Sequence, residues 1–371
     1  MKQRKKLLII KFSKILNQPR VHRQIHFLKD HYEITTAGFD ERSNSFIKHI
    51  NIKIPITNYG LPDKILWNLP LINSILRSNI LLDQNFDLII AHDPFPLALS
   101  FMIAKKCGAK VLLDAHEYTP RQFEHTWMQK YFLNTIWDYL CRRYLPLADE
   151  MITVCDGIAE EYKRNYGVNS YVITNAPYFP DLQPQSPVDD RIKLIHHGVA
   201  DESRKTKEMI YLMDYLDERF SLDLMLMKTN TNQRYYQEIL NLAKNNRRVI
   251  IKEPVAMPEI ATVINNYDIG LYMLWPTSFN TKMALPNKLF EFIQGRLAVS
   301  IWPSPEMAKV VKKYNLGIVA GDFTIQSIAE KLNDLSTEDI LRMKNNSHKA
   351  ANILCAENNK EKFLNIVDNL L

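Results

Sequence analysis

Short apolar runs alternate with longer amphipathic segments through most of the chain. The short runs are rich in β-branched residues, as buried strands are. The segment over residues 63–82 has a helical period, because Ile65, Leu69, Ile72, Leu76 and Ile80 recur at spacings of three and four. Alternation of this kind is typical of βα units around a parallel sheet. The pattern therefore predicts an α/β protein.

A proline-rich stretch separates the strand candidates into two series. Residues 175–190 carry four prolines and no apolar period, which indicates an interdomain linker. Strands are expected at residues 7–11, 33–38, 51–54, 88–91, 110–114, 151–154 and 171–174, then at 193–196, 223–227, 249–252, 269–272, 298–301 and 317–319, with a charged helix from residue 337 onward. We therefore expect two doubly wound, Rossmann-like domains facing a cleft, at residues 1–178 and 179–350, and a C-terminal helix at 351–371 that packs back towards the first domain.

The chain has 371 residues, enough for two domains, but only ten glycines. Their positions allow no G-x-G-x-x-G, no phosphate-binding P-loop and no G-x-S-x-G motif. The only pair at the last spacing, Gly317 and Gly321, encloses Ile-Val-Ala in place of a serine. Dehydrogenases with the dinucleotide fingerprint, protein kinases and serine hydrolases are therefore excluded.

The four cysteines are widely scattered without a C-x-x-C pair, which argues against a zinc ribbon and against a disulfide framework. The first apolar run, residues 7–10, is shorter than the roughly 7 to 15 residues of a signal sequence. No apolar stretch approaches the roughly 18 residues of a membrane span. We expect a cytoplasmic protein with ordinary thiols.

The net charge of +6 is distributed unevenly. Lys and Arg outnumber Asp and Glu by 23 to 17 in residues 1–180 and equal them, 24 to 24, in residues 181–371. A basic first half suits an anionic partner such as a lipid surface or a phosphorylated acceptor. A basic surface facing only solvent explains the excess equally well. No recognition motif for nucleic acid accompanies it, so we expect no nucleic-acid partner.

One predicted helix in the first half combines aromatic and basic residues. It is interpreted either as a surface for lipid headgroups or, better, as rings packed on the first sheet. Its residues are Trp127, Tyr131, Phe132, Trp137, Tyr139, Arg142 and Arg143.

The segment LPNKLFE at residues 285–291 is the sharpest local feature of the second half. Pro286 fits the first turn of a helix that would run to Gly295. The free N–H groups of such a helix start suit a diphosphate, and Lys288 adds positive charge. Glu291 is able to accept hydrogen bonds from two ribose hydroxyls. The alternative is a plain N-terminal turn with a solvated Lys and Glu.

Residues 196–205, HHGVADESRK, place a strand end and a loop before two adjacent cations at a helix start. Arg204 and Lys205 at such a position neutralise a departing pyrophosphate. Adjacent cations are also common on surfaces that only face solvent.

Two loops of the first half each place a histidine and a carboxylate just after a buried strand. These residues are His92, Asp93, His116 and Glu117, and they lie at the edge where α/β sheets bind ligands. A histidine there donates to a sugar hydroxyl or transfers a proton; the alternative is a hydrogen-bonded structural histidine. No H-E-x-x-H and no D-x-D occur in the chain, so we expect no metal.

Taken in order, four blocks resemble the GT-B glycosyltransferases, and within them the retaining group called family 4. The blocks are AHDPFPLALSFMIAKKCGAKVLLDAHE, ADEMITVCDGIAEEYKRNYGV with ITNAP after it, HHGVADESRK, and NYDIGLYMLWPTSFNTKMALPNKLFEFIQGRLAVSIWPSPE. They cover most of residues 90–320. The resemblance implies that the second domain binds a nucleotide sugar, that the first binds the acceptor, and that no metal is required.

The resemblance also assigns roles in the second domain. Glu291 occupies the place of the family's ribose-binding glutamate, whereas Met283 stands where a first glutamate would lie. The stretch Leu285, Pro286 and Asn287 would bring backbone amides to the phosphates, beside Lys288.

Further positions match the family around the diphosphate and the base. Lys205 matches the lysine on the leaving diphosphate, with Arg204 beside it. The position after Gly198, usually an arginine, is Val199 here. Pro254 and Val255 match the loop that reads the base through its backbone.

In the first domain, His116 matches the histidine that contacts the transferred sugar. The implied mechanism is attack of an acceptor hydroxyl on the face that the nucleotide leaves, while domain closure excludes water.

We therefore expect a glycosyltransferase that uses a nucleotide sugar, with UDP favoured over GDP, and a glycan or lipid-linked acceptor. Its expected place is the synthesis of a capsule, lipopolysaccharide or similar glycoconjugate, as a cytoplasmic or peripheral protein on the inner face of the membrane. Two alternatives stay open: a nucleotide-sugar epimerase of the same architecture, and a non-catalytic subunit that binds the nucleotide sugar.

Overall fold

The structure is a computed structural model whose backbone forms two compact units. It describes residues 4–15, 18–40, 47–52, 81, 84–122, 124, 134–187, 191–229 and 232–371. Unit 1 comprises Met1–Thr174, Ser278–Asn280 and Asn359–Leu371; unit 2 comprises Asn175–Thr277 and Thr281–Asn358.

Within the described residues, unit 1 contains a parallel sheet of seven strands in the order β3-β2-β1-β4-β5-β6-β7. The strands are β1 (Lys6–Ile10), β2 (Glu33–Gly38), β3 (Lys48–Asn51), β4 (Leu88–His92), β5 (Lys110–Ala115), β6 (Glu150–Thr153) and β7 (Tyr171–Val172). The helices are α1 (Pro19–Leu28), α4 (Leu97–Cys107), α5 (Asn134–Tyr144), α6 (Asp156–Tyr166) and the part of α15 (Ala356–Leu370) after residue 358.

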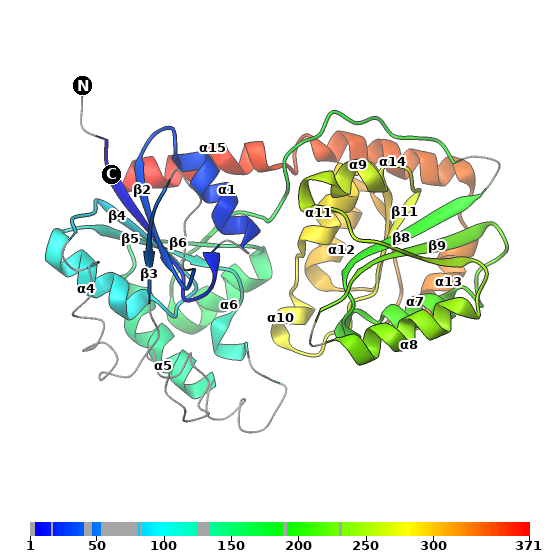
Figure 1. The fold of residues 1–371 in the computed structure, drawn as a ribbon, viewed down its shortest axis with the longest axis horizontal. Helices are drawn as coiled ribbons and strands as arrows, with labels where there is room; N and C mark the ends of the chain where they lie inside the picture. The colour runs from blue at the N-terminus through cyan, green and yellow to red at the C-terminus, as the bar shows by residue number, and fades with distance from the viewer. Residues whose placement is uncertain are drawn as a thin grey trace. The chain divides into compact units, whose positions relative to one another are not determined.

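The central strands of unit 1 are buried along almost their whole length because helices cover both faces of the sheet. All five residues of β4 are buried, and so are Leu7, Leu8, Ile9 and Ile10 of β1. Figure 1 shows α1 and the end of α15 on one face and α4, α5 and α6 on the other. The strand order reverses between β1 and β4, and ligands bind at this point in doubly wound sheets.

Unit 2 repeats this plan with a parallel sheet that has six strands among the described residues, in the order β10-β9-β8-β11-β12-β13. The strands are β8 (Ile192–Val199), β9 (Phe220–Met227), β10 (Val249–Lys252), β11 (Ile269–Tyr272), β12 (Ala298–Ile301) and β13 (Gly317–Val319). The helices are α7 (Thr206–Leu212), α8 (Gln233–Lys244), α9 (Ile260–Ile264), α10 (Phe279–Lys282, with residues 279–280 in unit 1), α11 (Asn287–Gln294), α12 (Pro305–Tyr314), α13 (Ile325–Asn333) and α14 (Thr337–Ala351).

Helices also cover both faces of the second sheet. One face carries α9, α11, α12 and α14, and the other carries α7, α8 and α13 (Figure 1). Here the strand order reverses between β8 and β11. Each unit therefore has its own topological switch point.

The predicted α/β class and two doubly wound sheets are confirmed, and the strands expected at 249–252, 269–272, 298–301 and 317–319 have the bounds observed. Of the strand expected at 51–54, residues 53–54 lie outside the described residues, and β3 starts earlier than expected, because Lys48 pairs with Thr35. The helix expected at 63–82 lies, except for Leu81, outside the described residues, as do Trp127, Tyr131 and Phe132. No helix among the described residues is long and apolar enough to cross a membrane.

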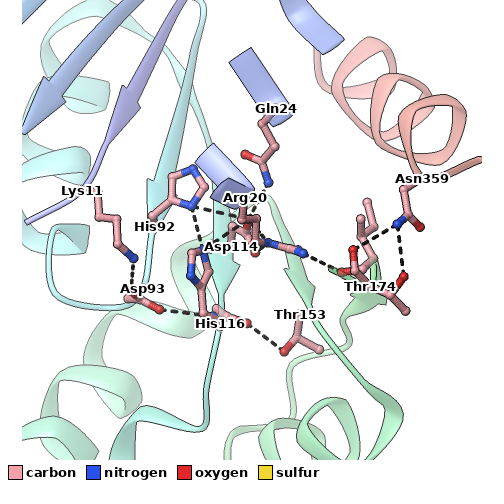
Figure 2. A network of polar contacts seen from close by, with 12 residues as sticks. Lys11, Arg20, Gln24, His92, Asp93, Asp114, His116, Thr153, Thr174 and Asn359 are labelled. Atoms are coloured by element: carbon pink, nitrogen blue, oxygen red, sulfur yellow. Dashed lines mark hydrogen bonds and ion pairs between the residues drawn. The ribbon is translucent and has the colours of Figure 1, made fainter. Parts of the chain in front are cut away.

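The last thirteen residues, Asn359–Leu371, are part of unit 1. The ring of Phe363 lies 6.3 Å from that of Phe27 in α1, and Asp368 accepts a hydrogen bond from Tyr32. Nδ2 of Asn359 donates to the carbonyl of Thr174 at 3.0 Å and to its hydroxyl at 3.1 Å (Figure 2). The contact boundary between the units falls after Thr174, four residues before the boundary expected from the linker.

Candidate active site

Unit 1 has a pocket of about 240 Å³ at its switch point. The strands that end there are β1, β4 and β5, and the loops after them supply the walls. The lining residues are Lys11, Phe12, Ser13, Gln18, His92, Asp93, Phe95, His116, Glu117 and Gln122. The four first-half candidates His92, Asp93, His116 and Glu117 therefore share one pocket.

Asp93 is fixed at the pocket by a strained backbone and an internal cation. Its φ is +65°, a left-handed value that few residues other than glycine adopt. Its carboxylate accepts from the Lys11 ammonium at 2.5 Å and from the backbone N–H of His116 at 3.1 Å. Burial alone would raise the pKa of Asp93, but Lys11 and then His116 lower it below its usual range. Asp93 is therefore a carboxylate that the chain itself neutralises.

Behind the pocket lies the buried carboxylate of Asp114, the fifth residue of β5. Arg20 Nε donates to both of its oxygens, at 3.0 and 2.7 Å, and Gln24 Nε2 donates to Oδ2 at 2.5 Å. Arg20 and Gln24 lie four residues apart on α1, so both reach the same carboxylate. Burial works to raise the pKa of Asp114, yet Arg20 and then His116 hold it well below its usual range.

His92 and His116 face each other beside this carboxylate (Figure 2). Nδ1 of His92 lies 2.9 Å from Nε2 of His116, and the two rings meet edge to face. Oδ2 of Asp114 lies 3.5 Å from the first nitrogen and 3.7 Å from the second. Burial lowers the pKa of His92 well below its usual value, against the opposing charge of Asp114. His92 is therefore neutral.

Three ligand atoms, one each from His92, Asp114 and His116, lie within 4.8 Å of one another, as in a metal site. Two observations argue against this interpretation. Asp114 already binds the guanidinium of Arg20, and the two histidine nitrogens are at direct hydrogen-bond distance. Arg20 and Gln24 already occupy most of the acceptor sites of this carboxylate, so the arrangement fits a shared proton better than a metal.

The unit 2 switch point is built around Gly198 near the end of β8. Its φ is +122°, and a Cβ atom placed there would lie 2.6 Å from Nζ of Lys288 and 3.3 Å from Nη1 of Arg204. Only glycine therefore lets these two cations approach the strand so closely. Arg204 is held there because Nη1 donates to the carbonyl of Val199 at 3.0 Å.

Neither Lys288 nor Arg204 forms an ion pair with a carboxylate in the part of the chain that the structure describes. Burial and the nearby Arg204 lower the pKa of Lys288 to about 7, although Glu291 opposes the shift. Nζ of Lys288 lies 5.7 Å from the ring centre of Tyr272, at the end of β11. The site therefore concentrates positive charge that an anion would stabilise.

Glu291 lies one turn into α11 and is 8% exposed. Its Oε2 lies 3.4 Å from Nε2 of His197. Burial, then Lys288, lowers the pKa of His197 well below its usual value, so this contact joins a carboxylate to a neutral imidazole.

The two cations predicted at one helix start separate in the structure. Arg204 ends a 3₁₀ turn and reaches Val199, whereas Lys205 has a φ of +51° and precedes α7. Nζ of Lys205 binds Glu208 at 3.1 Å and lies 5.5 Å from the ring centre of Trp275. Lys205 is therefore less available for an anion in this structure than Arg204.

Comparison with known proteins agrees with this architecture. Residues 21–176 match the model of Glycosyltransferase Family 4. No curated protein sequence matches the chain. Three solved structures share the fold at low identity. HepE of Anabaena, in complex with UDP and glucose, is 13% identical with a TM-score of 0.70 over 98% of this chain and 100% of that one.

The second is WaaG, a glycosyltransferase involved in lipopolysaccharide biosynthesis, at 11% identity and a TM-score of 0.68 over 97% and 99% of the two chains. The third is sucrose-phosphate synthase of Thermosynechococcus elongatus, at 11% identity and a TM-score of 0.73 over 99% of each chain.

The chain has the GT-B glycosyltransferase fold and is similar to family 4. The resemblance drawn from the sequence is thereby confirmed. In this GT-B fold, all but the last two residues of the family 4 match lie in unit 1, and unit 2 contains the cationic switch point.

Within unit 2 of the GT-B fold, Gly198, Arg204, Lys288 and Glu291 lie around the switch point. Leu285 is buried and Asn287 begins α11. One local prediction was wrong: Pro286 precedes the helix as its N-cap, with an extended ψ of 159°, and does not form its first turn. Pro254, exposed, and Val255, half-buried, lie in the loop after β10.

The sequence analysis did not single out Lys11, Arg20, Gln24 or Asp114 as site residues. A signal existed for Lys11, because it follows β1, whose end meets that of β4 at the switch point. Arg20 and Asp114 are 94 residues apart, and nothing in the local pattern predicts their contact.

Proposed function

We propose that the protein is a glycosyltransferase that moves a sugar from a nucleoside diphosphate to a hydroxyl of a glycan or lipid-linked acceptor, with retention and with no required metal. The observation that carries this proposal is the convergence of Lys288 and Arg204 on Gly198. Two cations held together with no ion pair to a carboxylate among the described residues suit a diphosphate.

The neighbours of this cationic site suit the rest of a nucleotide sugar. The backbone N–H groups at the start of α11, around Asn287, support binding of phosphate at a helix N-terminus. Glu291 is 8% exposed, and its carboxylate oxygens are suited to accept hydrogen bonds from ribose hydroxyls. The loop containing Pro254 and Val255 follows β10 at the same edge and is proposed for the base, with UDP favoured over GDP.

Arg204 also supplies a guanidinium group that the family pattern takes from another position in the sequence. The position after Gly198, usually an arginine in the family, is Val199, and Arg204 hydrogen-bonds the Val199 carbonyl. We propose that Arg204 takes over that role.

The pocket of unit 1 is proposed to hold a sugar ring. Its volume of about 240 Å³ is below the roughly 300 Å³ of the smallest drug-binding pockets, which suits one ring. Phe12 and Phe95 supply apolar walls, and the buried Ser13 Oγ and Gln122 Oε1 have no hydrogen-bond partner among the described residues. Hydroxyl groups of a sugar would satisfy both, and His116 is proposed to contact the transferred sugar.

In the proposed reaction the acceptor oxygen forms a bond to the anomeric carbon while the bond from that carbon to the phosphate oxygen breaks. The acceptor proton passes to the departing phosphate oxygen. Lys288, Arg204 and Lys205 stabilise the charge that develops on the diphosphate. Lys205 must leave Glu208 to take part, because their ion pair is 3.1 Å long.

A role in the synthesis of surface polysaccharide at a membrane is supported by the first unit. On α5 and the turn after it, Tyr139 and Leu147 are 63% and 58% exposed, beside the exposed Arg142 and Arg143. Exposed apolar groups among cations suit an anionic lipid surface. We therefore propose peripheral association with the membrane.

The test is release of nucleoside diphosphate from a panel of UDP- and GDP-sugars, with and without an acceptor extracted from lipid. Acceptor-stimulated release from one donor is expected. Glu291→Ala and Lys205→Ala should each lower turnover by about 100-fold or more. Lys207→Ala is the matched control, because Lys207 lies two residues after Lys205, in α7, and likewise pairs with a glutamate, Glu238.

Full activity in both variants would overturn the proposal. Isomerisation of the donor without an acceptor would indicate an epimerase. Tight donor binding without release would indicate a binding subunit.

A further inference from the structure

A network of buried hydrogen bonds lies behind the unit 1 pocket and is centred on Asp114. Asp114 is 0% exposed, and its carboxylate holds three hydrogen bonds from Arg20 and Gln24. Arg20 is fixed further because Nη1 donates to the carbonyl of Ile173 at 2.7 Å. A buried negative charge is therefore held rigidly beside the His92 and His116 rings (Figure 2).

The distance of 2.9 Å between Nδ1 of His92 and Nε2 of His116 allows a single proton between them. One nitrogen donates and the other accepts. The two possible arrangements differ in which nitrogen of His116 carries a proton, and therefore in what His116 offers to the pocket.

The surroundings of His92 decide between the arrangements. Its Nε2 is buried and has no hydrogen-bond partner among the described residues. If His92 accepted at Nδ1, its proton would lie on Nε2, and an N–H group would be buried without an acceptor, which is rare and costly in proteins. With the proton on Nδ1, His92 donates to His116, and the proton lies near the Asp114 carboxylate, 3.5 Å away.

We infer that Asp114 and His92 are positioning residues that hold His116 with its proton on Nδ1 and with Nε2 bare. Nε2 of His116 accepts from His92, and Nδ1 has no acceptor among the residues that the structure describes. Because His116 lines the pocket, it then presents an N–H donor there. The value of this donor to catalysis rests on the proposed function, whereas the tautomer itself does not.

This assignment narrows the chemistry of His116. An imidazole whose free nitrogen already carries a proton donates a hydrogen bond to a ligand oxygen and does not accept the proton of an attacking hydroxyl. The ligand group that meets His116 is therefore a hydroxyl, carbonyl or ether oxygen. Passage of the acceptor proton to the departing phosphate is consistent with this.

The tautomer is measured directly, without substrate. Long-range ¹H–¹⁵N correlation spectra of the full-length protein labelled with ¹⁵N-histidine distinguish a protonated from an unprotonated ring nitrogen. His116→Asn and His92→Gln each remove one set of signals and so assign them. We expect His116 with Nδ1 protonated and Nε2 bare at neutral pH. Protonation of His116 at Nε2 would overturn the inference.

Variants test the role of the positioning residues. The amide of His92→Gln retains a hydrogen-bond donor and should keep His116 protonated at Nδ1. His92→Met has no donor, so His116 should become a mixture of its two tautomers. Asp149→Asn is the matched control: Asp149 accepts from Val111 N–H at 2.8 Å, at the opposite end of β5. An unchanged His116 tautomer in His92→Met would overturn the role of His92.

The catalytic consequence is separable. In the transfer assay, His92→Met should lower kcat/KM by roughly tenfold, the value of about one hydrogen bond, while UDP affinity stays unchanged. Should transfer itself be absent in the wild type, the spectra still decide the tautomer, so failure of the proposed function and failure of this inference are distinct results. Equal kcat/KM in His92→Met and wild type would overturn the catalytic part.

Discussion

The two switch points of the molecule treat charge in opposite ways. In unit 1, Asp93 binds Lys11 and Asp114 binds Arg20, so each charge has a counterpart in the chain. In unit 2, Lys288 and Arg204 approach each other over Gly198, with no ion pair to either among the described residues. A site that holds a geometry pairs its charges internally, whereas a site that binds an anion leaves cations for the ligand.

The largest effect that separates the two sites is expected from removal of a single charge. Asp114→Ala leaves the buried Arg20 without its counterion, so the free energy of unfolding of unit 1 should fall by about 3 to 5 kcal/mol. Lys288→Met removes a cation that faces another cation, so unit 2 should keep or gain stability. Hydrogen exchange measured unit by unit checks both, and comparable losses in the two variants would break the comparison.

Acid should affect unit 2 before unit 1. Burial lowers the pKa of His196 to about 3, with a further contribution from Lys288, and the pKa values of His197 and His92 are also lowered. Below pH 6.5 the unfolded chain binds these protons and the folded chain does not, so stability is lost as pH falls.

At pH 5.5 the expected loss is roughly 1 kcal/mol for each histidine, twice as much in unit 2, with His196 and His197, as in unit 1 with His92. Urea unfolding of each unit at pH 7.5 and 5.5 measures it. A larger loss of stability in unit 1 would contradict the assignment of two buried neutral histidines to unit 2 and one to unit 1.

Binding of UDP should depend on the unpaired cations. Lys288→Met is expected to weaken UDP binding by about 2 kcal/mol, roughly 30-fold, because a charge-assisted hydrogen bond is lost. Lys313→Met, at an exposed lysine of α12, serves as the control. Calorimetry gives both affinities; equal values would show that Lys288 does not meet the diphosphate.

The smallest effect is a pH dependence of the same binding. The pKa of Lys288 is about 7 without ligand, and a bound diphosphate would raise it. The complex then holds more protons than the free protein above pH 7, so affinity should fall as pH rises, by at most about tenfold per pH unit. Lys288→Arg, which stays charged, should flatten this dependence between pH 7 and 9. A steep fall retained in that variant would assign the proton elsewhere.

Periodicity predicted the strands well where burial dictates them. The apolar run at 269–272 forms β11 with the expected bounds. The start of β3 was not predicted, because apolar alternation begins only at Ile50, whereas pairing with β2 brings Lys48 and His49 into the strand.

The candidate site was predictable only to the level of single loops. His92 ends β4 and His116 follows β5, the adjacent strand, so their common edge was expected from the sequence. Their hydrogen bond, and the anchoring of Asp114 by Arg20, depend on the docking of α1 across the sheet. Long-range docking of this kind leaves no period in the sequence, because it involves one or two polar side chains per helix.

The packing of residues 359–371 in unit 1 has a consequence for synthesis. The ribosome makes all of unit 2, through residue 358, before the partners of Phe27, Tyr32 and Thr174 emerge. The unit that is begun first is thus completed last, and its apolar face around Phe27 stays uncovered until the final turns of α15 leave the exit tunnel. A released chain truncated after residue 358 should therefore carry a complete unit 2 and a unit 1 that chaperones and proteases still recognise.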